Sequence, residues 1–548
     1  MEIVAKNGMV AAAHPIAAEN GLRILKKGGN AIDAAVATAF TLDLVDPGDS
    51  GIGGRGSMVI YLAESDEIVV VDYNTVCPKK ATPDIYEVIP TKEGEWWSVK
   101  DNANSIGYKA VSLPTTLLGL CLALENYGRM TLKDVMQPAI EVAKRGYEIN
   151  QFIENSIKGA ADKLRLFPAS SRIFLPEGRA PVRGERLAMK DYAKTLTKIA
   201  EGGPDVFYKG EIARIISKEM EANDGLITYE DLAGYEAQIV KPTSTSYHGY
   251  EFFPSTPTCS GGSFTLQTLN ILENFDLPGM GYCTPASIHV IAEALKLAWA
   301  DRLAYVADPQ FAKVPTAGIL SKTYARKLKD KINLERAVNR AKPGDPWKYN
   351  NGGSPDAGNT THISVIDKER NMMALTQTLC DWFGSGVTIP RTGIVMNNGM
   401  KWFNPNPGTP NSIEPGKKPL NNQCETVVTR NGTPFMTLGT PGGRRILSTI
   451  TLMSTNVVDY NLGTKAVAAP RFHIEDKEPL LIEQKWQEDI PGVENLFKAL
   501  KKMGHKIQLR YGPGTHISGP ASLIMVDSES HELKGAADPR QPGAAAGY

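Results

Sequence analysis

The spacing of apolar residues divides the first part of the chain into helices and strands. Between residues 14 and 42, apolar side chains recur at helical spacing, and Gly28-Gly29-Asn30 interrupts the pattern as a helix stop does. Two helices are therefore predicted at the start. Residues 57–62 and 68–72 are short, mainly apolar runs rich in Val and Ile, which predict two paired strands.

A glycine run, GIGGRG at residues 51–56, stands directly before the first of these strands. A dinucleotide-binding glycine motif needs a strand before it and a helix after it. The order here is the reverse, so nucleotide binding is not predicted.

The second half of the chain changes pattern at Thr360. Before it, a helix is predicted from Thr284-Pro285 to a stop at Asp308-Pro309, and residues 342–359 are rich in Pro, Gly and Asn, which predicts an exposed, mobile connector. From Thr360 onward the pattern predicts mainly strands and one helix. The predicted segments are a hairpin (361–366 and 372–379), two later strands (426–429 and 435–438) and a helix (446–458).

Composition and charge limit the classes of function. The 548 residues contain 60 Lys and Arg against 60 Asp and Glu, so neither nucleic acid nor a membrane is expected as a partner. The N-terminus has no signal-peptide pattern, which predicts a cytoplasmic protein as the chain stands, or an exported one if a leader has been removed. A small, near-neutral amide or peptide is the expected substrate.

The six cysteines and eight histidines show no metal-ligand spacing. The cysteines lie far apart without a CxxC pair, so they are expected to be free thiols. No metal or other cofactor is predicted.

A threonine that begins a strand directly after a connector suits a self-activating amidase. The Thr360 hydroxyl can attack the Asn359 carbonyl in an N-to-O acyl shift, and hydrolysis of that ester frees the α-amine of Thr360. An α-amine has a pKa near 8, so its neutral fraction can take the hydroxyl proton as a general base. Cleavage between Asn359 and Thr360 would thus create nucleophile and base in one residue.

Three further residues are candidates for this chemistry. Thr378 lies in the return strand of the predicted hairpin, where it could support Thr360 by a hydrogen bond. Gly442 and Gly443 follow a predicted strand and Pro441, and their amides could bind an oxyanion. Taken singly, however, a Thr-Thr pair most often reflects strand propensity, and Pro-Gly-Gly most often forms a turn.

Eight segments carry a more specific signal: 28–37 (GGNAIDAAVA), 50–54 (SGIGG), 232–235 (LAGY), 360–365 (TTHISV), 383–386 (FGSG), 439–443 (GTPGG), 469–472 (APRF) and 536–540 (AADPR). Together these segments resemble the γ-glutamyltransferase (glutathione hydrolase) family. The resemblance implies an α+β fold, the four-layer αββα sandwich of N-terminal nucleophile (Ntn) hydrolases. It also implies that Thr360 is the processed nucleophile, supported by Thr378, with Gly442 and Gly443 as the oxyanion hole.

The acyl-binding positions of that family do not carry over. Asn74 stands in the stretch where the family has an arginine for the substrate carboxylate, and Trp402 stands near the position of its ammonium-binding carboxylate. Cys380 replaces an asparagine, and Asn421 and Asn422 replace a pair of serines. These five residues are the predicted substrate-binding set, and losing charged hydrogen bonds predicts weak binding of a zwitterionic glutamyl group.

The prediction is an autoprocessed amidohydrolase whose fragments, 1–359 and 360–548, remain together as a heterodimer and could form a higher oligomer. Its acyl group passes to water or an amine and is not γ-glutamyl. A true γ-glutamyltranspeptidase is the first alternative, in which another arginine, such as Arg55 or Arg444, reaches the carboxylate. Acylases of the cephalosporin or oxamate type are further alternatives, and a non-catalytic binding protein is the alternative from another class.

Overall fold

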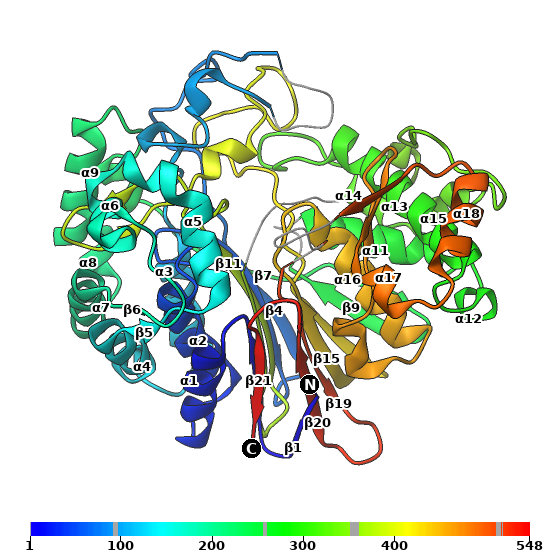
Figure 1. The fold of residues 1–548 in the computed structure, drawn as a ribbon, viewed down its shortest axis with the longest axis horizontal. Helices are drawn as coiled ribbons and strands as arrows, with labels where there is room; N and C mark the ends of the chain where they lie inside the picture. The colour runs from blue at the N-terminus through cyan, green and yellow to red at the C-terminus, as the bar shows by residue number, and fades with distance from the viewer. Residues whose placement is uncertain (1, 91–96, 256–259, 351–360, 511–516, 518) are drawn as a thin grey trace.

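Two seven-stranded sheets form the centre of the molecule (Figure 1). The computed structural model describes residues 2–90, 97–255, 260–350, 361–510, 517 and 519–548. In spatial order, the first sheet consists of β1 (Ile3–Ala5), β20 (Leu533–Ala537), β19 (Ser522–Val526), β15 (Thr433–Gly439), β14 (Thr426–Arg430), β9 (Tyr250–Pro254) and β8 (Thr245–Tyr247). The second consists of β21 (Ala544–Gly547), β2 (Met9–Ala12), β10 (Thr361–Ile366), β11 (Met372–Thr378), β3 (Arg55–Leu62), β4 (Glu67–Tyr73) and β7 (Gln238–Val240).

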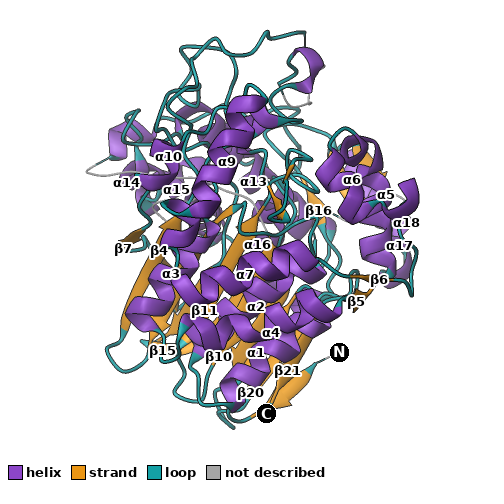
Figure 2. Ribbon diagram, turned by 90° about the vertical axis from the view of Figure 1, so that its left-hand side faces the viewer, coloured by secondary structure: helices purple, strands orange, loops and turns teal. Residues whose placement is uncertain are grey.

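A thin apolar layer joins the sheets face to face, with Met9, Val59 and Met372 from the second packed among Val427 and Ile524 from the first. Helices cover both outer faces (Figures 1 and 2). The helices over the second sheet include α1 (Pro15–Lys26), α2 (Ala31–Val45), α3 (Thr116–Tyr127) and α4 (Leu132–Arg145). Those over the first include α11 (Ser260–Leu272), α13 (Pro285–Tyr305) and α16 (Arg445–Val458). The predicted α+β, four-layer αββα sandwich is therefore confirmed.

Smaller elements extend these helical layers. The other helices are α5 (Gln151–Arg165), α6 (Pro168–Phe174), α7 (Lys190–Gly202), α8 (Asp205–Tyr208), α9 (Glu211–Ala222), α10 (Tyr229–Ala233), α12 (Leu277–Met280), α14 (Thr316–Ile319), α15 (Lys322–Lys329), α17 (Lys485–Asp489) and α18 (Val493–Lys502). The short strands are β5 (Tyr147–Glu148), β6 (Arg186–Leu187), β12 (Thr388–Ile389), β13 (Ile394–Val395), β16 (Phe472–His473), β17 (Leu480–Glu483) and β18 (Ile507–Arg510). Within the described ranges, no helix combines the length and apolarity needed to cross a bilayer.

The glycine stop between the first two helices acts as predicted, since α1 ends at Lys26 and α2 begins at Ala31. Asn30 caps α2 by accepting hydrogen bonds from the amides of residues 32 and 33, and its own amide donates to the Asp33 carboxylate. Every residue of α2 is buried, because α2 lies between the second sheet and its neighbouring helices. The predicted strands became β3 and β4, and the predicted hairpin became β10 and β11.

The described part of the predicted connector, residues 342–350, is mostly exposed, but several contacts attach it to the fold. Tyr305 donates a hydrogen bond to the Gly344 carbonyl at 2.7 Å, and the Gly344 amide donates to Asp301 at 2.6 Å. A 3-10 turn, η4 (Pro346–Tyr349), follows, and Tyr349 packs against Tyr324 with ring centroids 5.3 Å apart. The aromatic residues of this segment thus fix it to the fold despite its Pro and Gly content. Residues 351–359 lie outside the described residues.

The prediction of free thiols holds for the described cysteines, since none of them forms a disulfide. These are Cys77, Cys121, Cys283, Cys380 and Cys424. Cys259 lies outside the described residues.

Candidate active site

The predicted cleavage site, Asn359 and Thr360, lies outside the described residues. Thr361, the first described residue after them, begins β10 and pairs with Gln377 of β11. Thr378 is the next residue of β11 and ends that strand, and its hydroxyl accepts a hydrogen bond from the Cys380 amide at 2.7 Å. Thr378 is therefore held at the end of the hairpin where Thr361 begins.

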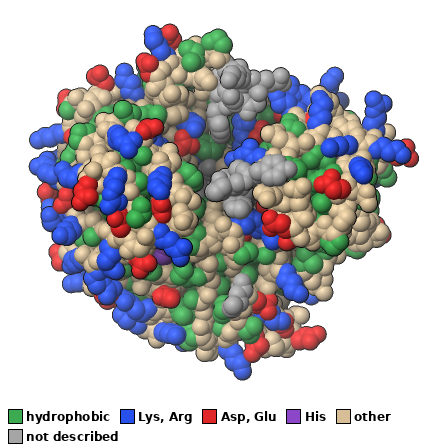
Figure 3. Space-filling model, viewed as in Figure 1, with side chains coloured by type: hydrophobic (Ala, Val, Ile, Leu, Met, Phe, Trp, Pro, Cys, Tyr) green, Lys and Arg blue, Asp and Glu red, His purple; other side chains and the backbone are tan. Residues whose placement is uncertain are grey.

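A cleft of about 1270 Å³ opens between α5 and the N-terminal end of α16. Its wall includes Cys380, Trp402, Gly442 and Gly443. In Figure 3 the surface is hollowed between the two helical halves of the molecule. Four of the predicted site residues thus face one cavity, although they are up to 63 positions apart in the chain (443 minus 380).

Gly442 and Gly443 connect β15 to α16 in a backbone conformation that favours glycine. Their φ angles are 138° and 63°. Neither amide donates a hydrogen bond to an acceptor in the described part of the chain. Because α16 begins at Arg445, both amides also lie at the positive end of a 14-residue helix. Two such donors at a cleft wall suit a developing negative oxygen.

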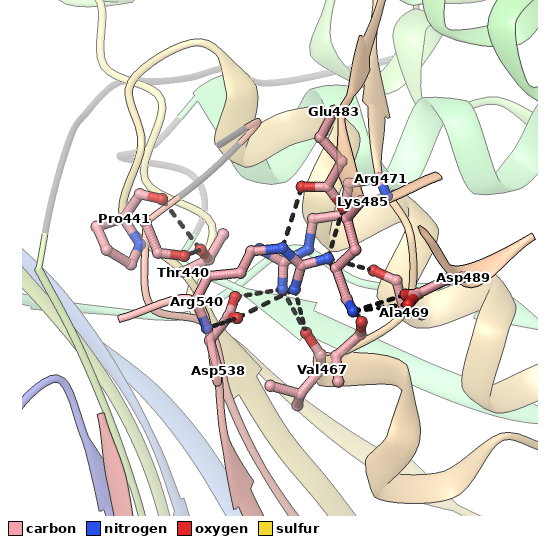
Figure 4. A network of polar contacts seen from close by, with 12 residues as sticks. Thr440, Pro441, Val467, Ala469, Arg471, Glu483, Lys485, Asp489, Asp538 and Arg540 are labelled. Atoms are coloured by element: carbon pink, nitrogen blue, oxygen red, sulfur yellow. Dashed lines mark hydrogen bonds and ion pairs between the residues drawn. The ribbon is translucent and has the colours of Figure 1, made fainter. Parts of the chain in front are cut away.

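A buried ion network braces the same wall (Figure 4). Arg540 contacts Glu483 at 2.5 Å and Asp538 at 3.0 Å, and Arg471 contacts Asp538 at 2.7 Å. Arg471 and Asp538 are almost fully buried, and Arg540 and Pro539 line the cleft. The APRF and AADPR segments therefore serve to position the wall.

Arg55 connects three residues of the predicted acyl-binding set. Its Nη1 donates to the Asn74 Oδ1 at 2.7 Å, its Nε donates to the Cys380 sulfur at 3.2 Å, and its guanidinium carbon lies 5.5 Å from the centre of the Trp402 ring. Cys380 and Trp402 line the cleft, whereas Arg55 and Asn74 lie behind them. The sequence raised Arg55 as an alternative, but its place among these three depends on contacts between separate strands.

Asn421 and Asn422 do not line this cleft, and both are fully buried. The Asn422 Oδ1 accepts a hydrogen bond from Arg302 at 2.6 Å, and the Asn421 Oδ1 accepts one from the Gln423 amide at 3.0 Å. Gln423 in turn donates to the Thr376 carbonyl of β11 at 2.6 Å. In the described contacts, this pair thus stabilises the chain beside β11.

The three carboxylates that line the cleft are already engaged. Asp381 contacts Lys401 at 2.6 Å and accepts a hydrogen bond from Asn398 at 2.8 Å. Burial alone would raise the pKa of Asp381, but the charge of Lys401 and the hydrogen bonds hold this pKa below its usual value. Burial raises the pKa of Asp49 to about 7. Glu475 is also buried, yet His473 and Arg444 lower its pKa to about 2. None of the three is a free anion for a substrate ammonium.

Among the described residues, His289, Glu293 and His505 form a group that could hold a metal ion, and none of the three lines the cleft. His289 and His505 hydrogen-bond each other at 2.9 Å, and His505 contacts Glu478 at 2.8 Å. Lys296 contacts both Glu293 and Glu478, at 2.8 and 2.6 Å. These contacts form a buried ion-pair network that links α13 to Glu478 and His505.

Known proteins with similar sequences include both hydrolases and acylases. The chain is 37% identical to the glutathione hydrolase proenzyme of Escherichia coli K12 over 98% of its own length and 91% of that protein. It is 38% identical to the acylase ACY 1 proenzyme of Pseudomonas sp. strain SE83, over 91% of its length and 87% of that protein. The fold is similar to the crystal structure of cephalosporin acylase from Bacillus halodurans, with a TM-score of 0.89, 29% identity, and coverage of 100% of this chain and 97% of that one.

The family whose sequence pattern matches is gamma-glutamyltranspeptidase, over residues 17–548. The match includes the hairpin of β10 and β11, the cleft wall at Gly442 and Gly443, and the Arg540 network. The chain is therefore an acyl-transfer hydrolase that belongs to the gamma-glutamyltranspeptidase family.

Proposed function

We propose that the protein is an amidohydrolase that cleaves itself between Asn359 and Thr360 and then forms an acyl-enzyme on the Thr360 hydroxyl. The freed α-amine acts as the general base, and water accepts the acyl group. One observation carries this proposal: the backbone amides of Gly442 and Gly443 have no hydrogen-bond acceptor among the described residues, and both glycines line the same cleft as Cys380. The Cys380 amide donates a hydrogen bond to the Thr378 hydroxyl. Thr378 directly follows Gln377, which pairs with Thr361 in the hairpin.

The topology supports a stable heterodimer of fragments 1–359 and 360–548. In the second sheet, β10 and β11 lie between β2 and β3, so strands on the two sides of the cleavage site alternate. In the first sheet, β14 pairs with β9 across the same division. Cutting the chain leaves these ladders and the apolar layer between the sheets intact, so the fragments stay associated.

The acyl group of the substrate carries no α-ammonium in our proposal. A buried ammonium needs an anionic partner, and Asp381, Asp49 and Glu475 are paired or weakened as anions. Beside Cys380 stands the indole of Trp402, and the cleft also carries six Arg or Lys side chains (Arg183, Lys401, Arg444, Arg445, Arg510 and Arg540). A cationic cleft disfavours a positively charged acyl group.

A panel of acyl p-nitroanilides tests this function. The processed protein should release p-nitroaniline from anilides without an amino group at least roughly 10-fold more efficiently than from γ-glutamyl-p-nitroanilide, because the ammonium would be left without a partner. The kcat/KM of each anilide is the measurement. A higher kcat/KM for the γ-glutamyl compound would establish a γ-glutamyltranspeptidase, the activity of the first alternative.

The hydroxyl of Thr378 gives a second prediction. Thr378→Val keeps the shape of the side chain but removes the acceptor of the Cys380 amide, leaving a partly buried donor unpaired. We expect self-cleavage and turnover to slow roughly 10- to 100-fold, because small displacements of positioned groups have effects of this size. Thr378→Ser, which keeps the oxygen, is the matched control and should remain within a few fold of wild type. Equal rates for the valine and serine variants would remove the supporting role of Thr378.

A further inference from the structure

Arg55 is a buried cation without a described counterion. Its side chain is 0% exposed, and no carboxylate of the described residues lies within ion-pair distance. Its polar neighbours are an amide oxygen and a thiol, from Asn74 and Cys380, and the third neighbour is the Trp402 ring. The amide oxygen and the ring carry no charge, and burial raises the pKa of the Cys380 thiol, which favours its neutral form.

Two donors of this cluster have no hydrogen-bond partner among the described residues: the Nη2 of Arg55 and the Nδ2 of Asn74. The Asn74 oxygen already accepts from Arg55, so the Asn74 amide group presents its nitrogen as the remaining donor. Burying a guanidinium without an anion is costly, and unpaired buried donors add to that cost. A carboxylate, with two oxygens, would satisfy both donors and the charge.

The cluster lies beside the candidate acyl-enzyme site. Arg55 on β3 pairs with Thr378 on β11, and the side chain of Arg55 reaches Cys380, two residues further along the chain. Cys380 and Trp402 separate Arg55 from the cleft that they line. An acyl group that enters between them would bring its far end to the guanidinium.

We propose that Arg55, together with Asn74, binds a carboxylate at the far end of the acyl group. This proposal rests on the proposed amidase function and deepens it. The substrates are then monoamides of dicarboxylic acids, whose acyl group has a terminal carboxylate and no α-ammonium. Arg55 is the specificity-determining residue, and hydrolysis releases the dicarboxylate and the amine.

The test compares charged and neutral acyl groups of the same shape. The p-nitroanilides of succinyl, glutaryl and adipyl groups are each paired with the corresponding primary amide, which is isosteric and uncharged. Wild-type protein should prefer the best carboxylate over its amide by about 100-fold in kcat/KM, as expected for loss of a charge-assisted, two-pronged contact. Arg55→Met should reduce that preference to below about 10-fold, because the contact that distinguishes the two acyl groups is lost.

Two further variants separate the role of Arg55 from general electrostatics. Arg183→Met removes the same charge from the lining of the same cleft but not from the cluster, and it should keep the wild-type preference. Arg55→Lys keeps the charge but loses the planar guanidinium that can form two hydrogen bonds to one carboxylate, so it should give an intermediate preference. Equal loss in the Arg183 and Arg55 variants would overturn the proposal in favour of a diffuse effect of cleft charge.

The outcomes also distinguish this proposal from the function on which it rests. If wild-type protein cleaves itself but hydrolyses no anilide of any kind, the amidase function fails. If it hydrolyses the neutral amides as well as the carboxylates, only the role of Arg55 fails. Should Arg55→Met not yield two fragments, inhibition of wild type by N-methylglutaramate and by uncharged N-methylglutaramide decides the matter. Equal inhibition constants would overturn the proposal, and stronger inhibition by the carboxylate would support it.

Discussion

Thr360→Ala should leave the protein as a single chain of 59.5 kDa, whereas the wild-type protein should separate into fragments of 359 and 189 residues (548 minus 359) on a denaturing gel. The alanine variant lacks the hydroxyl that attacks the Asn359 carbonyl, and it can form neither the ester nor the free threonine α-amine. Hydrolysis of every anilide should fall below detection, because nucleophile and general base are lost together.

The neighbouring threonine provides the matched control for this variant. Thr361 begins β10, and its hydroxyl lies 3.5 Å from the Asp46 carboxylate. Thr361→Ala removes an equivalent hydroxyl one residue later, so it should still yield two fragments. Thr360→Ser should also cleave, more slowly, because serine supplies the hydroxyl without the methyl group that restricts its rotamer. Two fragments from Thr360→Ala would mean that another protease makes the cut.

Local patterns predicted several central elements because their signals are local, whereas the four-layer architecture was predicted from the family resemblance. The glycine stop and the Asn30 cap define α1 and α2, and Thr284 caps α13 as expected. The predicted stop at Asp308-Pro309 is a few residues late, because α13 ends at Tyr305. The pairing of β1 with β20 joins the two ends of the chain, and no periodicity within either strand could indicate it.

Part of the candidate site could likewise be predicted from the sequence, and part depends on the fold. The predictions for Thr360, Gly442 and Gly443 rest on the family resemblance, because a threonine or a glycine turn alone is not specific. The central position of Arg55 could not be predicted, because it depends on which strand lies beside β11 and on how the Trp402 segment folds over β3. Its only sequence signal is a charged residue in a glycine-rich run that opens a buried strand.

The backbone at Gly442 gives the second large expected effect. With φ at 138°, this position lies where L-residues are rarely found, so Gly442→Ala forces the peptide to rotate and re-aims the adjoining amides. Loss of one oxyanion donor typically lowers kcat by about 100- to 1,000-fold. We expect that loss in Gly442→Ala, with KM changed much less because the acyl-binding side chains stay in place.

Gly432→Ala is the control for backbone strain. Gly432 has a φ of 75° and open space around its Cβ position, and it forms the turn between β14 and β15, at the opposite end of β15 from Gly442. Both alanine variants should lower the free energy of unfolding by about 1–3 kcal/mol, as measured by chemical denaturation. Only Gly442→Ala should lose turnover, because the proposed oxyanion donors are the Gly442 and Gly443 amides and Gly432 lies at the other end of β15. If both variants kept the wild-type kcat, the Gly442 and Gly443 amides would not stabilise the oxyanion, and donors elsewhere in the cleft would have to do so.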